Sequence, residues 1–405
     1  MNGCHSATAT AVSLLSIVES TLGGVWGNSI DEADDEMVQA RVVRGTEFKH
    51  WNEEKGRGGA IRAINPSSLE KRRLKVGDIL IEVSGGGPKQ PVGRCLVVDD
   101  EALAGDLPLV FSNFVRRIRL KQQAIPHYVS IFLWYAHATG LTEQFQNNST
   151  NLRNLDFKRF LAEVSVPLPS LAEQRRLVKR IEGLTMRAQE LRSLNASLVE
   201  DADRLLEADY KRICRDARTQ PFGKVAKLVR RRVEMHPDES YPETGIRSFG
   251  KGTFHKPALT GLQLGNKRVF RICTGDLVFM NVFAWEGAIA VAKPEDEGRV
   301  ASHRFMMHEV DPKLATAEFL CYHLLTDHGL EHIRAASPGS AGRNRTLGIT
   351  KLHAIPVPIP PIEAQRRFSK LHALRDKLRK LQAETESELA AFTPALLAKA
   401  FRGEL

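Results

Sequence analysis

The sequence has few cysteines and no long apolar run. Its five cysteines are scattered among 405 residues, and no two are spaced as CxxC. This odd, dispersed set favours buried thiols in a reducing cytoplasm over a disulfide framework or a zinc site. No apolar stretch approaches the ~18 residues that a membrane-spanning helix needs. We therefore expect a cytoplasmic protein that does not contact a membrane.

Motifs for catalysis are also missing. There is no GxxxxGK[ST] loop for a nucleoside triphosphate and no HExxH zinc motif. Residues 65–68 (NPSS) lack the second proline and the aromatic residue of an amino-methyltransferase motif, and no lysine stands two residues after Glu82 or Glu286, as a metal-dependent nuclease requires. His328 and His332 are four residues apart, but such a pair is more often plain surface than a metal site. We expect the chain alone to catalyse nothing and to hold no metal or cofactor.

Basic residues exceed acidic ones. The formal net charge is +10, which favours a polyanionic partner. With 42% hydrophobic and 26% charged residues, the composition is that of an ordinary globular protein. The length allows two or three domains, each large enough to bury a core.

One segment of the sequence occurs twice. VPLPSLAEQRRL at residues 166–177 returns as VPIPPIEAQRRF at residues 357–368, 191 positions later. A repeat of this size indicates a duplicated module, because solenoid repeats are ~20–50 residues long. The capping box Ser170-x-x-Glu173 predicts that a helix begins in the first copy. We expect two globular units, each followed by a long helix.

Heptads follow both copies. The first set predicts one helix over residues 171–214 with the 4-3 spacing of a coiled-coil seam. In the second set the spacing drifts, and Pro394 is expected to kink or end the helix. We expect the two helices to pair within one chain; pairing between two copies of the chain is the alternative. The expected seam residues are Leu177, Ile181, Leu184, Ala188, Leu191, Asn195, Leu198, Ala202 and Leu205, and then Leu371, Leu374, Leu378, Leu381, Thr385, Leu389 and Phe392.

Four short echoes link the segments that precede the two helices. Both segments are expected to consist of short strands with one or two helices near the end. The echoes come in the same order but at a shrinking offset, which indicates loops of different length on one frame. Gly-Asp before an apolar run is expected to be a turn that feeds a strand. The pairs are residues 43–45 and 246–248, 77–80 and 275–278, 111–114 and 301–304, and 140–141 and 329–330.

These echoes, the two helix starts and the closing residues 391–405 (AFTPALLAKAFRGEL) resemble the specificity (S) subunit of type I restriction–modification systems. The resemblance implies an α+β fold with two similar target recognition domains, separated by two long antiparallel coiled-coil helices. The boundaries expected are an N-terminal extension at 1–11, target recognition domains at 12–169 and 217–360, and spacer helices at 170–216 and 361–405.

The resemblance also implies what the chain works with. Each domain would read one half of a bipartite target in double-stranded DNA, while the helices set the spacer and dock two methyltransferase (M) subunits. Restriction/translocase (R) subunits would join the complex. S-adenosylmethionine, ATP and Mg²⁺ are expected on those partners, and this chain is expected to be a non-catalytic specificity subunit.

Base-edge contacts need arginine, lysine, asparagine, glutamine, serine or threonine side chains on loops that reach a groove, above a basic floor. The segments 146–154 and 337–346 are expected to be equivalent polar loops just before the repeat. Two further pairs stand at equivalent strand ends. The candidate DNA-binding residues are Arg44, Asn113, Asn151, Arg153, Asn154, Arg247, His303, Arg343, Asn344, Arg345 and Thr346.

The helix starts are the expected partner-docking sites. Ala364 replaces the acid that the first copy has at Glu173, and Glu363 is expected to supply that charge one position earlier. Two other functions stay open: a coiled-coil scaffold with two protein-binding heads, and a recognition fragment of a fused methyltransferase or nuclease. The candidate docking residues are Glu173, Gln174, Arg175, Arg176, Glu363, Gln365, Arg366 and Arg367.

Overall fold

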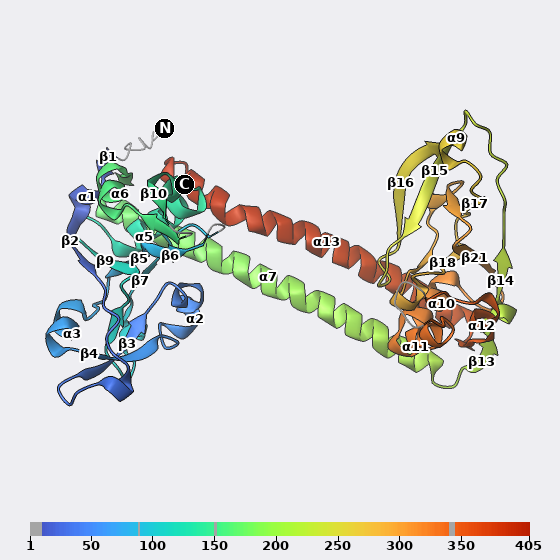
Figure 1. Ribbon diagram of the computed structural model, residues 1–405, viewed down its shortest axis with the longest axis horizontal. Coiled ribbons are helices and arrows are strands. Elements are labelled where there is room, and N and C mark those ends of the chain that lie inside the picture. The colour runs from blue at the N-terminus through green and yellow to red at the C-terminus, as the bar shows by residue number, and fades with distance from the viewer. Residues whose placement is uncertain (1–9, 88–89, 150–151, 340–344) are drawn as a thin grey trace, which may run out of the picture. The chain divides into compact units, whose positions relative to one another are not determined.

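The computed structural model of the chain describes residues 10–87, 90–149, 152–339 and 345–405. The chain forms two compact units (Figure 1). The first runs to Ser193 and also takes in Thr385–Leu405, and the second comprises Leu194–Glu384. No helix in the described ranges is long and apolar enough to span a membrane.

Two principal sheets build the first unit. The four-stranded one has the order β2-β9-β5-β7 and is antiparallel throughout. The three-stranded one has the order β4-β3-β8, with β3 and β8 parallel. The strands are β1 (Thr10–Ser13), β2 (Val18–Gly23), β3 (Val38–Val43), β4 (Ala60–Ile64), β5 (Ile79–Glu82), β6 (Ser84–Gly86), β7 (Cys95–Val97), β8 (Leu109–Phe111), β9 (Val115–Leu120), β10 (Gln146–Ser149), β11 (Leu152–Leu155) and β12 (Ser165–Leu168).

The second unit repeats both sheets. Its strand order β14-β21-β18-β19 matches β2-β9-β5-β7, and β16-β15-β20 matches β4-β3-β8, including the parallel pair. It adds β17 to the second sheet, and its described residues, which leave out 340–344, show no counterpart of the small sheet β10-β11-β6 of the first unit. The strands are β13 (Arg218–Pro221), β14 (Ala226–Val229), β15 (Ser240–Ile246), β16 (Thr253–Thr260), β17 (Val269–Arg271), β18 (Leu277–Met280), β19 (Ile289–Val291), β20 (Val300–Ser302), β21 (Phe305–Val310) and β22 (Pro356–Ile359).

The short helices also correspond. α5 in the first unit and α10 in the second follow the main sheet, and each contributes its apolar face to the core of its own unit. This agreement confirms the predicted α+β fold with a duplicated frame. The helices are α1 (Leu14–Ile17), η1 (Ile30–Glu32), η2 (Glu47–His50), α2 (Trp51–Glu54), α3 (Pro66–Arg72), α4 (Asp100–Leu103), α5 (Pro126–Ala138), η3 (Leu141–Phe145), α6 (Phe157–Glu163), α8 (Phe222–Val225), α9 (Gly261–Leu264), η4 (Ala284–Glu286), η5 (Pro294–Asp296), α10 (Ala317–Leu325), α11 (Asp327–Ala335) and α12 (Ile349–Ala354).

The two Gly-Asp echoes are turns, as predicted. Gly77 and Gly275 have φ of 84° and 86°, a conformation that glycine adopts without strain. Each following aspartate is buried and accepts a hydrogen bond from the backbone N–H three residues earlier. Asp78 also accepts two hydrogen bonds from Arg119, and Asp276 two from Arg231. Both carboxylates therefore hold their turn in place.

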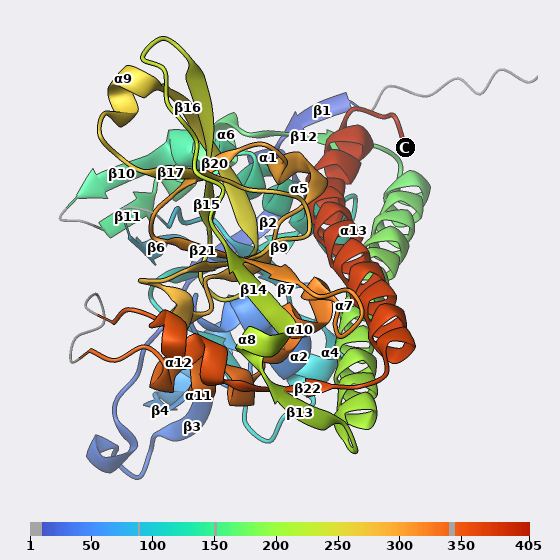
Figure 2. The same ribbon diagram turned by 90° about the vertical axis from the view of Figure 1, so that its right-hand side faces the viewer.

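Two long helices complete the fold, α7 (Leu171–Cys214) and α13 (Ile362–Phe401). Figures 1 and 2 show them side by side. In the first unit Ile181 of α7 packs with Leu396 and Leu397 of α13. In the second unit Tyr210 of α7 packs with Phe368 of α13. Residue numbers rise on one helix as they fall on the other, so the pair is antiparallel and intramolecular, as predicted.

The seam differs from the expected heptads. Leu177, Ile181 and Ala188 are buried as predicted, but Leu191, Leu198 and Leu205 are each more than half exposed. Asn195 and Ala202 turn inward as predicted, and beyond Ala188 the full inward stripe follows Arg192, Asn195, Val199, Ala202, Leu206, Tyr210 and Ile213. Taken as a whole from Leu177 to Ile213, the inward stripe makes ten steps in 36 residues, which is the 3.6-residue period of a straight helix rather than the 3.5 period of a supercoil. On α13, Leu374 and Leu381 are likewise exposed, and Arg375 and Gln382 turn inward.

Pro394 does not end α13. The helix continues to Phe401 because Leu396, Leu397 and Ala400 are buried against Ile181 and the neighbouring α5. Tertiary packing there outweighs the lost backbone hydrogen bond. Phe401 then lies against Tyr128, Phe132 and Tyr135 of α5, as Tyr210 at the end of α7 lies against Phe319, Tyr322 and Phe368 in the second unit.

Candidate nucleic-acid interface and helix starts

In each unit, the residue that follows the third strand of the main sheet binds two other loops through its backbone hydrogen bonds. In the second unit Asn281, directly after β18, donates its N–H to the carbonyl oxygen of Arg304 (3.0 Å) and accepts from the N–H of Leu347 (2.9 Å). In the first unit Val83, directly after β5, bonds in the same way to Phe114 and Leu155, at 2.9 Å each. We call each cluster the loop junction of its unit.

The two junctions bring predicted DNA-binding residues together. Asn113 lies beside Phe114, and His303 beside Arg304, and all four side chains are exposed. Arg153 and Asn154 precede Leu155, as Arg345 and Thr346 precede Leu347. Asn151, Arg343 and Asn344 lie outside the described residues. The pairing inferred from the sequence is therefore an equivalence of position in the fold.

The segment expected as a loop in the first unit is partly a hairpin. β10 and β11 pair antiparallel, and β11 also pairs with β6 next to Val83. Asn154 accepts a 2.5 Å hydrogen bond from Ser84, and Arg153 forms a 2.8 Å ion pair with Glu143. Strand pairing was missed because a run of amides and hydroxyls has low strand propensity and is typical of loops.

A third loop joins the junction of the second unit. Residues 247–252 connect β15 to β16, and they are held against the loop that contains η4. Phe249 and Gly250 donate their N–H groups to the carbonyl oxygens of Glu286 (2.8 Å) and Gly287 (2.9 Å), and Ser248 donates its hydroxyl to the Glu286 carboxylate (3.0 Å). The predicted contact residue Arg247 thus stands at a fixed loop.

Arginines of the second junction stack on aromatic rings. The guanidinium carbon of Arg247 lies 4.9 Å from the ring centroid of Phe254, and that of Arg345 lies 5.2 Å from Trp285. Arg247 also donates to the carbonyl oxygen of Thr253 at 3.3 Å. A stacked guanidinium keeps its edge donors available, which suits bidentate recognition of guanine or phosphate.

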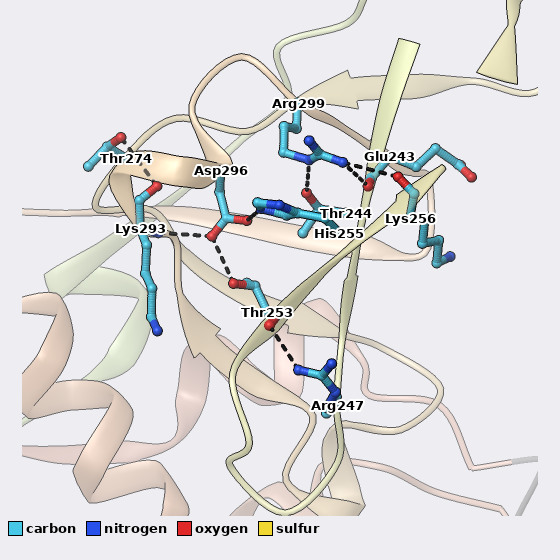
Figure 3. A network of polar contacts seen from close by, with 10 residues as sticks. All are labelled: Glu243, Thr244, Arg247, Thr253, His255, Lys256, Thr274, Lys293, Asp296 and Arg299. Carbon is cyan, nitrogen blue, oxygen red and sulfur yellow. Dashed lines mark hydrogen bonds and ion pairs between the residues drawn. The ribbon is translucent and has the colours of Figure 1, made fainter. Parts of the chain in front are cut away.

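The hairpin that carries Arg247 is braced by the polar network of Figure 3. Asp296 is fully buried and accepts from Thr253 (2.8 Å), from the Lys293 backbone (3.0 Å) and pairs with His255 (3.1 Å). Arg299 bonds to Thr244 of β15 and to the carbonyl oxygens of residues 243 and 256. Because these bonds tie β15 and β16 to the η5 loop, the connecting loop has a rigid base.

Arginines near the first junction pair with carboxylates, whereas those of the second junction stack on aromatic rings. Arg44 donates to Glu47 at 2.6 Å, and this hydrogen bond raises the pKa of Arg44. Burial opposes ionisation of Glu47, yet the hydrogen bonds from Arg44 and Thr46 hold its pKa below the usual value. Arg94 makes a two-bond pair with the buried Glu82. Arg44 would therefore have to share its donors with Glu47 in any base contact.

Both helix starts contain the same buried clamp. Gln174 accepts from the N–H of Ile125 (2.8 Å) and donates to the carbonyl oxygens of Gln123 and Pro169 (3.1 and 2.8 Å). Gln365 accepts from the N–H of Thr316 (3.1 Å) and donates to Leu314 and Pro360 (2.9 and 2.8 Å). Both side chains are fully buried, so they offer no atom to a partner. This corrects their assignment as docking residues: the repeated glutamine fastens each helix to its own unit.

The charged neighbours remain on the surface. Ser170 accepts from the N–H of Glu173 (3.3 Å), so the predicted cap is present, but the Glu173 carboxylate turns to Arg176. The hydrogen bond from Arg176 lowers the pKa of Glu173. Glu363 pairs with Arg366 at 2.6 Å, the same spacing one position earlier. Arg175 and Arg367 are exposed, and Arg175 lines a hollow of about 220 Å³ together with His127, Lys179 and Glu182.

Two surface features were not predicted. Leu194, Leu198 and Leu205 form an exposed apolar stripe on α7, since the sequence pattern had assigned two of them to the seam. Phe249 is exposed at the tip of the loop between β15 and β16. Within the described residues no three histidine, cysteine, aspartate or glutamate side chains are grouped to hold a metal ion.

Comparison with known proteins supports the architecture. No protein-family model matches the chain, and no curated protein sequence matches it. The structure is similar to the crystal structure of the HsdS subunit from Thermoanaerobacter tengcongensis, with a TM-score of 0.59 at 19% identity over 98% of this chain and 97% of that chain. A chain from a structure of the type I R-M system, solved to explain complex assembly and conformational transition, gives a TM-score of 0.57 at 19% identity over 98% of each chain. The chain thus has the fold of an HsdS subunit along nearly its whole length.

Proposed function

We propose that this chain is the DNA-recognition subunit of a type I restriction–modification complex. Each globular unit would read one half of a bipartite target in double-stranded DNA, and the paired helices would set the spacer between the halves. The fold shared with HsdS supports this proposal. S-adenosylmethionine, ATP and Mg²⁺ would be held by the partner subunits.

The matched loop junctions carry the proposal. Val83 and Asn281 make the same two backbone hydrogen bonds in the two units, yet the side chains around them differ. A constant frame with variable loops is the usual arrangement where loops carry specificity. A two-unit reader of an asymmetric sequence needs this combination, because its halves must present equivalent surfaces with different donors and acceptors.

Methyltransferase subunits would dock on the exposed faces of α7 and α13. The stripe Leu194, Leu198 and Leu205 offers an apolar helix face of the kind that partner helices cover. Near the start of α7, Arg175 and Lys179 add positive charge. These residues replace the buried glutamines as the proposed contact points.

Methylation mapping tests the function. The full chain, expressed with a type I methyltransferase subunit from the same genome, should direct adenine methylation to a gapped two-part sequence. Exchanging residues 12–165 for those of a relative should change one half of that sequence only. A contiguous target, or no methylation that depends on this chain, would contradict the proposal.

A single residue sharpens the same test. Arg345→Ala removes the guanidinium stacked on Trp285 and should relax one half-site, at a cost of about 1–3 kcal/mol in discrimination. Arg268→Ala, at an exposed position between α9 and β17 of the same unit, outside the loop junction and the two long helices, serves as the matched control. Loss of both half-sites in Arg345→Ala would argue against independent reading by the two units.

The main alternative is a coiled-coil scaffold whose units bind proteins. Such a scaffold would bind its partners with little dependence on salt, whereas phosphate contacts make DNA binding fall steeply with ionic strength. A titration of the full chain with duplex DNA at several salt concentrations separates the two.

A further inference from the structure

Phe249 is the most exposed aromatic side chain of the described residues, at 73%. Its backbone has φ of 62°, in the left-handed region that bulky residues rarely adopt. Such strain persists only where the surrounding structure imposes it, and it gathers at functional sites. Since most of the residue is in solvent, the fold gains little packing from its ring. A residue kept at such a position needs an explanation outside the folding of the chain.

The loop around Phe249 is held rigidly from both sides. The backbone bonds to Glu286 and Gly287 fix it against the η4 loop. The Asp296 network, drawn in Figure 3, fixes the two strands that carry it. At Gly250 an added Cβ would lie 3.0 Å from Leu325, so the tip packs closely on α10. The backbone that carries the ring is therefore held at one place, and the loop has little flexibility to lose on binding.

Cationic residues stand on both sides of Phe249 in the loop, and the carboxylate that is bonded to this loop among the described residues, that of Glu286, accepts from Ser248. The Lys251 ammonium lies 5.8 Å from the ring centroid of Phe249, and Arg247 stands two residues before Phe249. Arg345 and Trp285 belong to the same loop junction. An exposed flat ring with a cationic rim suits a polyanion that also carries π faces, and duplex DNA has both. A protein partner would be expected to meet a broader apolar patch with fewer charges.

We propose that Phe249 is a wedge that inserts at a base step of the bound duplex and stacks on a base, while Lys251 contacts the adjacent phosphate. This inference rests on the proposed DNA-recognition function and adds to it a contact that separates two stacked base pairs. Apolar side chains inserted in this way partly unstack the step and bend the duplex. Sequence preference at that step would then come from the ease of unstacking, in addition to base-edge hydrogen bonds.

The test measures affinity of the full chain for a fluorescently labelled duplex of mixed sequence at several salt concentrations. Phe249→Ala should lower affinity about ten-fold, as expected for the loss of one stacked base. The dependence on salt should stay that of the wild type, because the ring releases no counterion. Lys251→Ala should instead reduce the slope of log affinity against log salt by about one.

Three further variants separate binding from folding. Phe249→Gly relieves the left-handed strain, so the chain should be at least as stable as the wild type and yet bind as weakly as Phe249→Ala. Phe249→Trp should keep affinity, and its emission should be quenched when duplex is added. Leu262→Ala is the matched control, because Leu262 on α9 is 79% exposed in the same unit but lies outside the loop junction; it should bind as the wild type does.

The outcomes distinguish this inference from the function beneath it. Suppose that the wild type binds duplex with the expected salt dependence and that Phe249→Ala and Phe249→Gly both bind as tightly as the wild type. The wedge is then wrong, while the proposed DNA recognition stands. Equal losses in Phe249→Ala and Leu262→Ala would also overturn the wedge, since they would reflect a general surface effect. If the wild type binds no duplex at any salt concentration, both proposals fail together.

Discussion

The two units share a frame but equip it differently. In the first, the arginines near the junction are held by carboxylates, with Arg44 on Glu47 and Arg153 on Glu143. In the second, they are held by rings, with Arg247 on Phe254 and Arg345 on Trp285. An acid competes with DNA for the donors of its arginine, whereas a ring leaves them free. The comparison teaches that one scaffold can carry two contact chemistries, which the proposed reading of two different half-sites would require.

Where the units agree, they agree in buried polar bonds. The clamps of Gln174 and Gln365 each tie the start of a long helix to the backbone just before the core helix α5 or α10. The turn aspartates agree as well, although Asp78 binds an arginine of β9 and Asp276 binds Arg231, two residues after the end of β14. The buried hydrogen bonds that the two units share maintain the common frame, while the strands and loops that supply the partner side chains differ.

Breaking the clamps should have the largest effect. Gln174→Leu and Gln365→Leu each leave one backbone N–H and two carbonyl oxygens buried without their partner. We expect each to lower the free energy of unfolding by about 3 kcal/mol, because unsatisfied buried groups cost about 1–3 kcal/mol each and partial relaxation recovers some of it. Urea unfolding of the full chain measures this. If the frames are equivalent, the two losses match.

The control for the clamps is Gln189→Leu, at an exposed position of the same helix α7. This variant should change stability by less than about 0.5 kcal/mol, as surface substitutions generally do. A small loss in either clamp variant, or a loss confined to one unit, would show that the shared hydrogen bonds do not perform the same role twice.

A buried histidine distinguishes the units by pH. His308 on β21 pairs with Leu277 in register, and the matching partner of Ile79 in the first unit is Ile118. Burial and the nearby His353 lower the pKa of His308 to about 3. Below pH ~6.5 His308 is protonated in the unfolded chain but stays neutral in the folded chain. Stability should therefore be lost as the pH falls from about 6.5 towards 3, by about 2 kcal/mol at pH 5.

His308→Ile, the residue type of the first unit, should remove that part of the pH dependence. The measurement compares urea unfolding at pH 7 and pH 5 for the wild type and the variant. His236→Gln, at an exposed position of the same unit, should behave as the wild type does. An unchanged difference between the two pH values in His308→Ile would contradict the assignment.

The shared frame could be predicted from the sequence because the residues that define it have strong local conformational preferences. Proline before the helix start and Gly-Asp before a strand each specify a local geometry, and both copies keep them. The repeated glutamine marked the helix start in both copies, but its clamp was not predicted, because burial of a glutamine depends on the backbone packed around it. Within the candidate site, the equivalence of Asn113 with His303 could be read for the same reason: both follow a serine in the turn between matching strands.

Beyond Ala188 the predicted seam is right at Asn195 and Ala202 but wrong at the leucines, because hydrophobic pattern rules place leucines inside. In this pair Arg375 and Asp203 turn towards each other instead, while Leu198 and Leu205 face outward. Tertiary ion pairing is not a local property of the sequence. Phe249 did leave a signal, since an aromatic residue in the glycine-rich stretch Phe249-Gly250-Lys251-Gly252 is unusual for a turn. The sequence does not show its exposure, which depends on the η4 loop that supports it.

Ion pairs between the two helices should distinguish the units least. In the second unit Asp203 of α7 accepts from both Arg375 (3.2 Å) and Arg379 (2.5 Å) of α13, and in the first unit Glu386 meets only Arg192 (3.3 Å). Asp203→Asn should cost about 0.5–1 kcal/mol and Glu386→Gln close to nothing, because an isolated exposed pair contributes little. High salt should reduce the stability cost of Asp203→Asn, because it screens the ion pair. A double-mutant cycle with Arg375→Gln isolates the Asp203 pair. Equal costs for the two variants would mean that the second arginine adds nothing, and the helix pair would then be held by its apolar contacts alone at both ends.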